Sequence, residues 1–331
     1  MSPVASAHRS TGIDLLRVLG VIAVVAGHVW SDDAVRTAVY SWHVPLFFFL
    51  TGYLWTAGRT VRSEVGRRAR SLLQPYLVWL GLIAVVWVPW SAAAGSSTMT
   101  DLVRLAVGGQ HLVRPFSAFW FVTALFVCAV AFRALERFPT PVAWAVAVGG
   151  LVTTVIAPEL VLLPPLSAGT AMPALVFVLV GRTARGLLPR VRRPVLTGTV
   201  LVAAAALAIA LGVRPLDLKH ADFGTPVLSV AVASAISAGA ILVATATGPA
   251  TGRRAGALVT ALAASGIGVV LTHAVVIWAL PGAPSTLVFI TATAIPWMVA
   301  VIAARTPAAP WLLGTRNHRA ASVPATASTR P

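Results

Sequence analysis

One apolar stretch near the N-terminus carries three ionisable side chains, Asp14, Arg17 and His28. The eleven steps from Arg17 to His28 end about 20° past three full turns of a helix, and Asp14 lies about 40° from the same line. We therefore expect all three on one helix face, with Arg17 and His28 about 16 Å apart along the axis. A neutral imidazole takes a proton from a hydroxyl group and returns it near neutral pH, so His28 has the chemistry of a general base.

A structural interpretation of the same residues also stands. Asp14 and Arg17 are three residues apart, a spacing at which side chains pair on a helix. In that interpretation the pair lies at the inner membrane surface, and His28 only satisfies a partner inside the protein. Ionisable groups inside a membrane are costly, however, and they mark a functional site by default.

Two further histidines, His43 and His273, are expected at the depth of His28. His43 opens a second apolar stretch, in which Pro45 suits the first turn of a helix. His273 follows Arg254 by nineteen residues, about 28 Å along a helix, which also places it in the outer part of the membrane. No two of the three histidines share a metal-ligand spacing on one helix, so we expect no metal site.

A cluster of five arginines follows the second apolar stretch. As inner-side bases they would hold the flanking helices in place and touch lipid phosphates. Alternatively, Arg67 and Arg70, one helical turn apart, would clamp the phosphates of a cytosolic ligand by charge-assisted bonds. The five residues are Arg59, Arg62, Arg67, Arg68 and Arg70.

The composition identifies the elements that position these residues. Of 331 residues, 58% are hydrophobic and 10% are charged, whereas a soluble domain carries about 25% charge, so a soluble enzyme is disfavoured. Ten apolar stretches approach the about 20 residues that cross a bilayer core. We predict an all-α integral membrane bundle of about ten transmembrane helices, at residues 12–30, 40–57, 72–94, 116–135, 141–158, 167–184, 195–212, 225–247, 256–280 and 284–303.

The basic residues alternate between the two sides of this predicted bundle. With the N-terminus inside, nineteen of the 25 Lys and Arg residues fall on the inner side and five on the outer side, and Arg17 lies within the first span. The positive-inside rule therefore predicts that both termini are cytoplasmic. The net charge of +16 then reflects topology, and we expect no nucleic-acid partner, because such binders gather their bases on one face of a soluble domain. The five outer bases are Arg36, Arg104, Arg114, Arg214 and Lys219.

The predicted spans define one transmembrane domain, residues 1–305. Residues 306–331 are rich in Pro, Ala, Ser, Thr and Arg, which predicts a disordered cytoplasmic tail. The single cysteine, Cys128, lies in an apolar stretch and has no cysteine in the chain with which to form a disulfide. Abundant Ala, with Arg in place of nearly all Lys, indicates a GC-rich bacterial genome, so we expect a multi-pass protein of a bacterial cell membrane.

Several short motifs resemble, in order, those of the membrane acyltransferase 3 family. That family opens with Ile-Asp-x-x-Arg and a histidine separated from the arginine by ten residues, and continues with Pro-Leu-Phe-Phe-x-x-Ser-Gly-Tyr. Then come Arg-x-x-Arg with Pro-Tyr, a Trp-Phe-Leu block and a histidine in a late span. The matching positions here are Ile13, Asp14, Arg17 and His28; Pro45 to Tyr53, with Thr51 for Ser; Arg67, Arg70, Pro75 and Tyr76; Phe119 to Leu125; and Thr272 with His273.

The resemblance implies a role for each matching residue. His28 is the implied catalytic histidine, and Arg17 with Asp14 supports it or the donor. The donor acyl-CoA is implied to contact Arg67, Arg70 and Arg59, and the acceptor side is implied to include His43, His273 and Trp120. The segment 120–123 lacks the glutamates of one branch of the family, so an acidic partner for His28 must come from elsewhere.

The resemblance also implies an O-acyltransferase that uses cytosolic acyl-CoA, most commonly acetyl-CoA, as co-substrate and holds no bound cofactor. Its acceptor would be a hydroxyl group of a glycan, a lipid-linked sugar or a natural product, with membrane lipid as the other partner. The rival from another class is a transporter or flippase of a glycan or lipid intermediate, with proton-carrying histidines and anion-binding arginines. A third interpretation is a structural or sensory membrane protein. Asp14 is the one clear intramembrane acid in the sequence, which counts against the transporter, and consumption of a thioester would distinguish the enzyme from both rivals.

Overall fold

The computed structural model describes residues 10–248 and 252–315. These residues fold into α-helices joined by short 3-10 and π segments, and no β-strand occurs among them. An isolated bridge between Asp217 and Asp222 is the one strand-like pairing in the described ranges. The predicted all-α fold is therefore confirmed.

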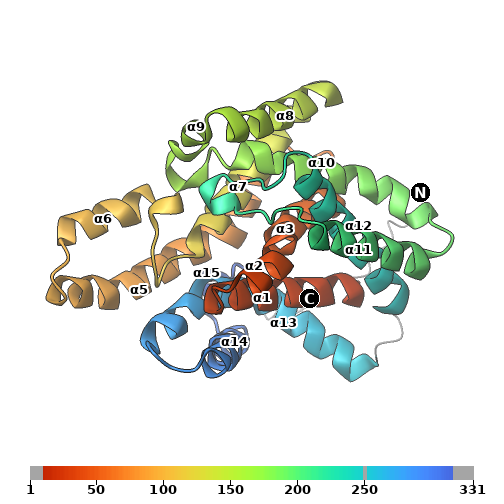
Figure 1. The fold of residues 1–331 in the computed structure, drawn as a ribbon. Coiled ribbons are helices and arrows are strands. Elements are labelled where there is room, and N and C mark those ends of the chain that lie inside the picture. The colour runs from red at the N-terminus through yellow and green to blue at the C-terminus, as the bar shows by residue number, and fades with distance from the viewer. Residues whose placement is uncertain (1–9, 249–251, 316–331) are drawn as a thin grey trace, which may run out of the picture.

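Each predicted span contains one apolar helix of the bundle shown in Figure 1. In that view α5 and α6 extend to one side, and α11 and α12 lie on the other. The helices are α1 (Thr11–Val29), α3 (His43–Tyr53), α5 (Gln74–Ala93), α7 (Phe119–Leu135), α8 (Thr140–Ile156), α10 (Ala171–Leu187), α11 (Pro194–Ala210), α12 (Leu228–Thr247), α13 (Arg253–Ala279) and α14 (Ser285–Ala303). Between them lie the shorter helices α2 (Asp33–Tyr40), α4 (Val61–Arg68), α6 (Thr98–Val107) and α9 (Pro158–Leu162), and α15 (Ala309–Leu313) follows α14.

Among the described residues, six helical segments are long and apolar enough to cross a membrane, and α7, α8 and α11 are shorter apolar helices. This supports a multi-pass membrane protein. The count of ten crossings and the cytoplasmic position of both termini stay predictions, and residues 1–9 and 316–331 lie outside the described ranges. The six segments are Thr11–Val29, Val61–Ala93, Pro165–Arg190, Leu228–Thr247, Arg253–Ala279 and Ser285–Ala303.

The second predicted span, 40–57, differs most from the structure. Its helix, α3, has 11 residues, about 16 Å, which is roughly half the thickness of a bilayer core. The polar helix α2 precedes it, capped by the Asp32 side chain, which accepts a hydrogen bond from the backbone N–H of Val35. Helix α3 ends at Tyr53, before the extended segment that carries Arg59. A short α3 therefore joins the polar helix α2 to the segment that carries Arg59.

Helix α1 lies at the centre of the bundle and packs against α3, α12 and α13. The Ser10 side chain caps its N-terminus by accepting from the Ile13 backbone N–H, and Asp14 lies in the first turn, where the helix dipole favours an acid. A side chain at Gly12 would meet the backbone of Ala244 in α12. This close backbone approach is typical of small residues at membrane helix interfaces.

Helix α10 packs against α3 in the same way, through close backbone approach at glycines. A side chain at Gly52 would meet the backbone carbonyl of Val178, and one at Gly181 would meet that of Phe49. The two backbones thus approach directly, and α3 is held although it is short. His43 at its start and Phe47 in its middle are thereby placed on a rigid support.

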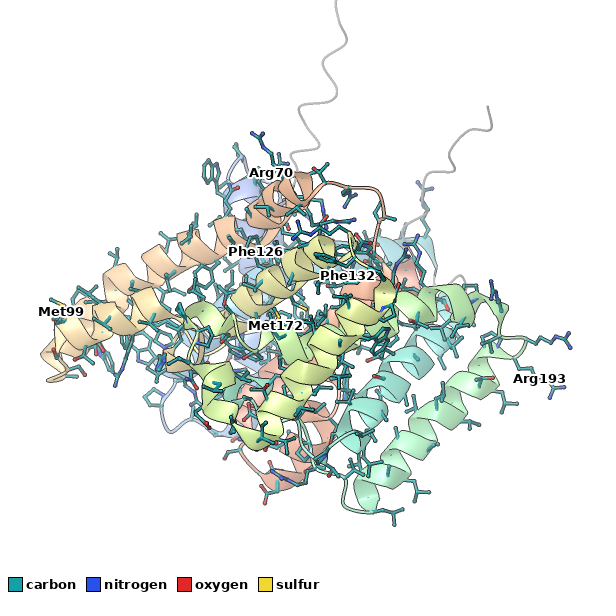
Figure 2. All side chains as sticks on the ribbon, turned by 90° about the horizontal axis from the view of Figure 1, so that it is seen from above. Arg70, Met99, Phe126, Phe132, Met172 and Arg193 are labelled. Carbon is teal, nitrogen blue, oxygen red and sulfur yellow. The ribbon has the colours of Figure 1, made fainter. Side chains whose placement is uncertain are left out.

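A continuous helical rod of 33 residues, Val61–Ala93, joins α4 to α5 through a π-helical segment, η1 (Ala69–Leu73). In Figure 2 Arg70 lies at one end of this rod and Met99, in α6, lies beyond the other. One face of α5 exposes large apolar side chains, for example Val85 at 75%, as expected for a surface that faces lipid.

The predicted disordered tail does not begin at residue 306. Ala309–Leu313 form α15, which packs against α5, α13 and α14 with Leu313 buried. The Trp79 indole N–H also donates to the Leu312 carbonyl at 2.9 Å. The apolar residues of this stretch explain its folding, and residues 316–331 lie outside the described ranges.

Candidate active site

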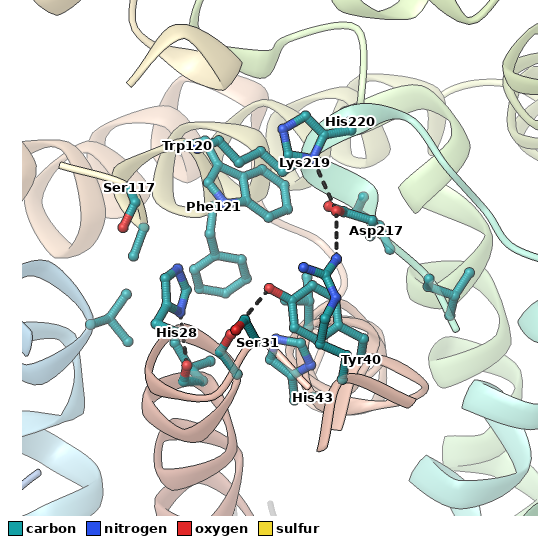
Figure 3. Close-up of a pocket in the computed structure, with 18 of the residues that line it drawn as sticks. His28, Ser31, Tyr40, His43, Ser117, Trp120, Phe121, Asp217, Lys219 and His220 are labelled. Atoms are coloured by element: carbon teal, nitrogen blue, oxygen red, sulfur yellow. Dashed lines mark hydrogen bonds and ion pairs between the residues drawn. The ribbon is translucent and has the colours of Figure 1, made fainter. Parts of the chain in front are cut away.

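A cavity of about 240 Å³ lies beside His28 at the C-terminal end of α1 (Figure 3). Its other walls come from α2, the start of α3, residues 114–121 and the loop of residues 216–220. Because this end of α1 is the predicted outer end, we call it the outer cavity. The lining residues that bear on chemistry are His28, His43, Ser117, Trp120, Asp217 and Lys219.

The hydrogen bond of His28 fixes its tautomer. Its Nδ1 lies 2.8 Å from the Val24 carbonyl oxygen, four residues earlier in α1. A carbonyl oxygen only accepts, so Nδ1 carries the hydrogen and Nε2 of the neutral ring holds the lone pair. Figure 3 shows this second nitrogen directed away from α1. His28 is therefore oriented as a proton acceptor.

The other two predicted histidines lie close to His28. The His273 ring packs edge-on against that of His28, with centroids 4.9 Å apart, and its Nε2 is buried with no hydrogen-bond partner in the described part of the chain. His43 lines the outer cavity with its ring 4.9 Å from that of Tyr40. Both rings donate from Nδ1 to a carbonyl four residues earlier, at 2.7 Å for His43 and 2.9 Å for His273.

Charged side chains from two outer segments form the rim of the cavity. Arg36 of α2 lies 3.5 Å from the Asp217 carboxylate, and His220 Nδ1 lies 3.0 Å from it. The Lys219 ammonium donates to the Leu112 carbonyl at 2.8 Å, and Arg114 donates to the His28 carbonyl at 3.1 Å. The rim thus fixes the loop over the end of α1.

Two rim residues have shifted pKa values. Burial alone would raise the pKa of Asp217, but His220 and Arg36 outweigh it, so the pKa of this carboxyl lies below its ordinary value. Burial lowers the pKa of Lys219, against the opposing charge of Asp217. Asp217 is therefore an anion at neutral pH, and it is an acid near His28 that the sequence analysis did not identify.

Hydrogen-bond donors face the cavity from residues 117–121. The Ser117 hydroxyl is buried and has no hydrogen-bond partner within the described ranges, and Trp120 lines the same wall. Helix α7 begins at Phe119 with the backbone of Ala118 as its N-cap, so this wall is the start of a helix. A hydroxyl or oxyanion beside His28 would find these donors.

A second cavity, of about 520 Å³, lies toward the other end of α1, and we call it the inner cavity. Arg17 lines it, together with apolar residues of α3, α7 and α13. The arginine segment closes it with Arg59, Arg67 and Arg68. Four guanidinium groups around one cavity favour a ligand with several negative charges.

A buried carboxylate, Glu64 of α4, holds the inner arginines together. It is fully buried and pairs with Arg68 at 2.9 Å, with Arg59 at 3.6 Å, with Arg133 at 3.7 Å and with Arg67 more closely. One carboxylate thus serves four guanidinium groups, and a surplus of positive charge remains. The sequence analysis missed Glu64, although its spacing of three and four residues from Arg67 and Arg68 is a recognisable signal.

Of the three arginines predicted to bind the acyl-CoA donor, two line the inner cavity and one does not. Arg59 and Arg67 line the inner cavity, whereas Arg70 is exposed and donates to the Gly66 carbonyl at 3.1 Å. Arg70 lies within the π-helical segment Ala69–Leu73, and it is not among the residues that line the inner cavity. Arg68, which was not predicted to bind the donor, faces the cavity instead.

The ionisable residues on the predicted face of α1 open to two different cavities. Arg17 opens to the inner cavity and its Nη1 lies 2.9 Å from the carboxylate of Asp14, which is buried. His28 opens to the outer cavity. The structure therefore brings Arg17 together with the inner arginines, about 16 Å along α1 from His28.

Aromatic rings separate the two cavities. Phe47 of α3 lines the inner cavity and Phe121 of α7 lines the outer one, and their ring centroids are 5.4 Å apart. Phe47 fits over Gly20 of α1, where a side chain would come within 2.9 Å of its ring. A ligand arm that passes from one cavity to the other has to displace this pair.

No group of three His, Cys, Asp or Glu side chains in the described ranges has a geometry that could hold a metal ion. The charged residues that line the inner cavity are arginines, whereas the outer cavity is lined by histidines, arginines, Asp217 and Lys219. Cys128 is buried in α7.

Comparison with known proteins gives a family and two distant relatives. The profile of a family described as "Acyltransferase domain" matches residues 10–312. Nodulation protein NolL of Mesorhizobium japonicum is 25% identical over 170 residues, which cover 45% of this chain and 42% of that protein. Nodulation protein NolL of Sinorhizobium fredii is 28% identical over 149 residues, covering 40% of this chain and 39% of that protein. The chain thus matches about two fifths of the length of these relatives, and no solved structure matches it significantly.

Proposed function

Because this chain belongs to the acyltransferase 3 family, we propose that it is an integral-membrane O-acyltransferase. It moves an acyl group, acetyl in the simplest case, from cytosolic acyl-CoA to a hydroxyl group in the outer cavity. The observation that carries the proposal is the pair of cavities on α1, one with His28 and one with four arginines. The family match does not favour the transporter.

The inner cavity suits the phosphate-rich end of CoA. Arg67 and Arg59 are each about one-third exposed and so keep donors free for a ligand beyond their bonds to Glu64. Guanidinium groups bind phosphate through paired hydrogen bonds. Arg17 lies deeper along α1, where the pantetheine arm of CoA would pass toward Phe47 and Phe121.

The acyl-transfer step is a direct attack at the thioester. The Nε2 of His28 takes the proton of the acceptor hydroxyl as the oxygen bonds to the thioester carbonyl carbon. The carbon–sulfur bond then breaks, CoA leaves as the thiolate, and the proton on His28 passes to that sulfur. The products are the O-acyl ester and free CoA thiol, and His28 returns to its neutral form.

The tetrahedral intermediate carries an oxyanion, which requires hydrogen-bond donors. The Ser117 hydroxyl and Trp120 are at the outer cavity, whereas Arg17 lies at the inner one. A well-placed donor lowers such a barrier by about 3–4 kcal/mol. Ser117 and Trp120 are therefore the proposed oxyanion donors.

Release of free thiol from acetyl-CoA by purified protein in nanodiscs tests the proposal. The reaction contains labelled acetyl-CoA and a bacterial envelope extract as acceptor, and compares wild type with His28→Ala. The matched control is His111→Ala, since His111 is exposed and lines neither cavity. We expect label transfer by wild type and His111→Ala and a loss of about 10²-fold or more in His28→Ala. Equal transfer by His28→Ala would refute the role of His28, and no thiol release by wild type would refute the enzyme.

A further inference from the structure

A third cavity, of about 540 Å³, opens at the same end of the bundle as His28. Its walls are mostly apolar and come from the second half of α8, from Val176 of α10, from the loop of residues 214–227 and from Val230 of α12. Val152 and Val227 line it and are 49% and 78% exposed, so it is open to the surroundings of the bundle. We call it the apolar groove.

A small polar cavity of about 230 Å³, which we call the polar passage, shares lining residues with both the apolar groove and the outer cavity. This passage shares Arg36, Tyr40 and Asp217 with the outer cavity. It shares Arg214 and Asp222 with the apolar groove. A continuous path of lining residues therefore runs from exposed hydrocarbon-like surface to His28.

The loop at the junction is firmly held. The backbone N–H groups of Asp217 and Asp222 each donate to the carbonyl of the other residue, at 2.8 and 3.0 Å. The Arg214 backbone N–H donates to the Thr225 hydroxyl at 3.0 Å. These hydrogen bonds fix the loop that carries Arg214 between the apolar groove and the polar passage.

Arg214 is available to an anion. Its guanidinium pairs with Asp222 at 2.9 Å, but the two side chains are 66% and 43% exposed. An ion pair so exposed contributes little, so a phosphate can replace the carboxylate on the guanidinium. Arg214 is one of the few outer-side bases, and it lies between an apolar groove and a polar passage.

We propose that the acceptor is an anionic lipid-linked molecule, whose hydrocarbon chain lies in the apolar groove. Its phosphate pairs with Arg214, and its hydroxyl-bearing headgroup extends along the passage to His28. This inference rests on the proposed acyl transfer and names the acceptor class for it. A large apolar groove that joins a reaction cavity offers binding energy through burial of hydrocarbon, and a water-soluble acceptor would gain nothing from it.

Photolabelling tests the proposal without relying on transfer. The probe is dodecyl phosphate with a diazirine in its chain, added to the full protein in nanodiscs, and labelled peptides are mapped by mass spectrometry. We expect labels in residues 148–155 and 226–230, which excess unlabelled dodecyl phosphate removes and inorganic phosphate does not. Val152→Trp, which fills the groove, should reduce this labelling at least fivefold.

Controls separate the groove from general contact with lipid. Leu207→Trp on α11 changes a side chain that is 60% exposed and outside the groove, and it should leave labelling unchanged. Arg214→Gln should weaken labelling by the phosphate probe to the level of the matching dodecanol probe. Labels spread over all exposed helices, or insensitive to Val152→Trp, would overturn the proposal. Competition by inorganic phosphate alone would also overturn it, because a free anion would then be the ligand. Thiol release from acetyl-CoA is measured separately, so failure of the groove and failure of the enzyme are distinguishable.

Discussion

The outer and inner cavities on α1 differ in where their charged groups lie. Beside the inner cavity one buried carboxylate, Glu64, pairs with four arginines, and three of them, Arg59, Arg67 and Arg68, line the cavity. At the outer cavity the proposed general base, His28, is hydrogen-bonded to one backbone carbonyl, and the ion pairs lie on the rim. The inner site is therefore built to bind charge, and the outer site is built to keep a neutral base.

The two cavities should also differ in how substitutions affect the protein. Removing Glu64 leaves the mostly buried guanidinium of Arg68 without its carboxylate partner, whereas the ion pairs of the outer rim involve groups that water can reach. Loss of Glu64 should therefore reduce stability, whereas loss of a residue that acts on the acceptor at the outer cavity should reduce turnover.

Glu64→Ala should give the largest loss of stability. Removing one partner of a buried ion pair costs about 3–5 kcal/mol because the other charges stay buried, and Glu64 is fully buried. The check is the Tm of the purified protein, with Glu159→Ala as the control, since Glu159 is an exposed carboxylate on α9. A Tm for Glu64→Ala equal to that of the control would show that the arginine cluster does not depend on this carboxylate.

Ser117→Ala should reduce turnover without reducing stability. Loss of one oxyanion donor lowers kcat by about 10², whereas the hydroxyl has no hydrogen bond to lose within the described ranges. Ser234→Ala is the matched control, because the hydroxyl of Ser234 on α12 is also buried and unpaired in those ranges. The prediction fails if the two variants have the same kcat, or if Ser117→Ala lowers Tm.

Asp217→Asn should have the smallest effect. Its ion pair with Arg36 is part-exposed, and such pairs contribute about 0–1 kcal/mol. Although burial would raise it, the pKa of Asp217 lies below its ordinary value because of His220 and Arg36. The contribution is thus complete above the unfolded-state pKa of about 3.9 and is lost as the pH falls through the lower folded-state pKa.

A series of thermal melts at different pH values checks how the contribution of Asp217 depends on pH. We expect Tm of Asp217→Asn to lie less than about 3 °C below wild type at pH 7, and the gap to close as the pH is lowered below about 4. A gap that does not change as the pH falls below about 4 would mean that another group controls the rim.

Local periodicity predicted much of the scaffold. The apolar stretches located each of the ten longer helices, and the helical wheel of α1 predicted one face for Asp14, Arg17 and His28. The common depth expected for the histidines agrees with the 4.9 Å between the rings of His28 and His273. These features depend on residues within one helix, or on distance along a helix, which the sequence contains directly.

Contacts between distant segments could not be read in the same way. Asp217 reaches the outer cavity from a loop 189 residues after His28, and nothing local marks that approach, although Lys219 as the single lysine of the chain was a signal. Nor does the sequence mark the π-helical segment Ala69–Leu73, in which Arg70 lies. The short length of α3 was hidden because its apolar residues continue into Leu54 and Trp55 beyond the helix end.

The most direct test of the central claim, donor binding inside and proton transfer outside, measures CoA affinity and acyl transfer in the same preparations. Wild type, His28→Ala and Arg67→Ala are titrated with CoA by calorimetry in nanodiscs and assayed with labelled acetyl-CoA. We predict that His28→Ala keeps the wild-type Kd for CoA and loses transfer by about 10²-fold or more. Arg67→Ala should raise the Kd about tenfold, as loss of a charged hydrogen bond implies, and keep its kcat. Loss of CoA binding in His28→Ala, or an unchanged Kd in Arg67→Ala, would contradict the division of labour between the two cavities.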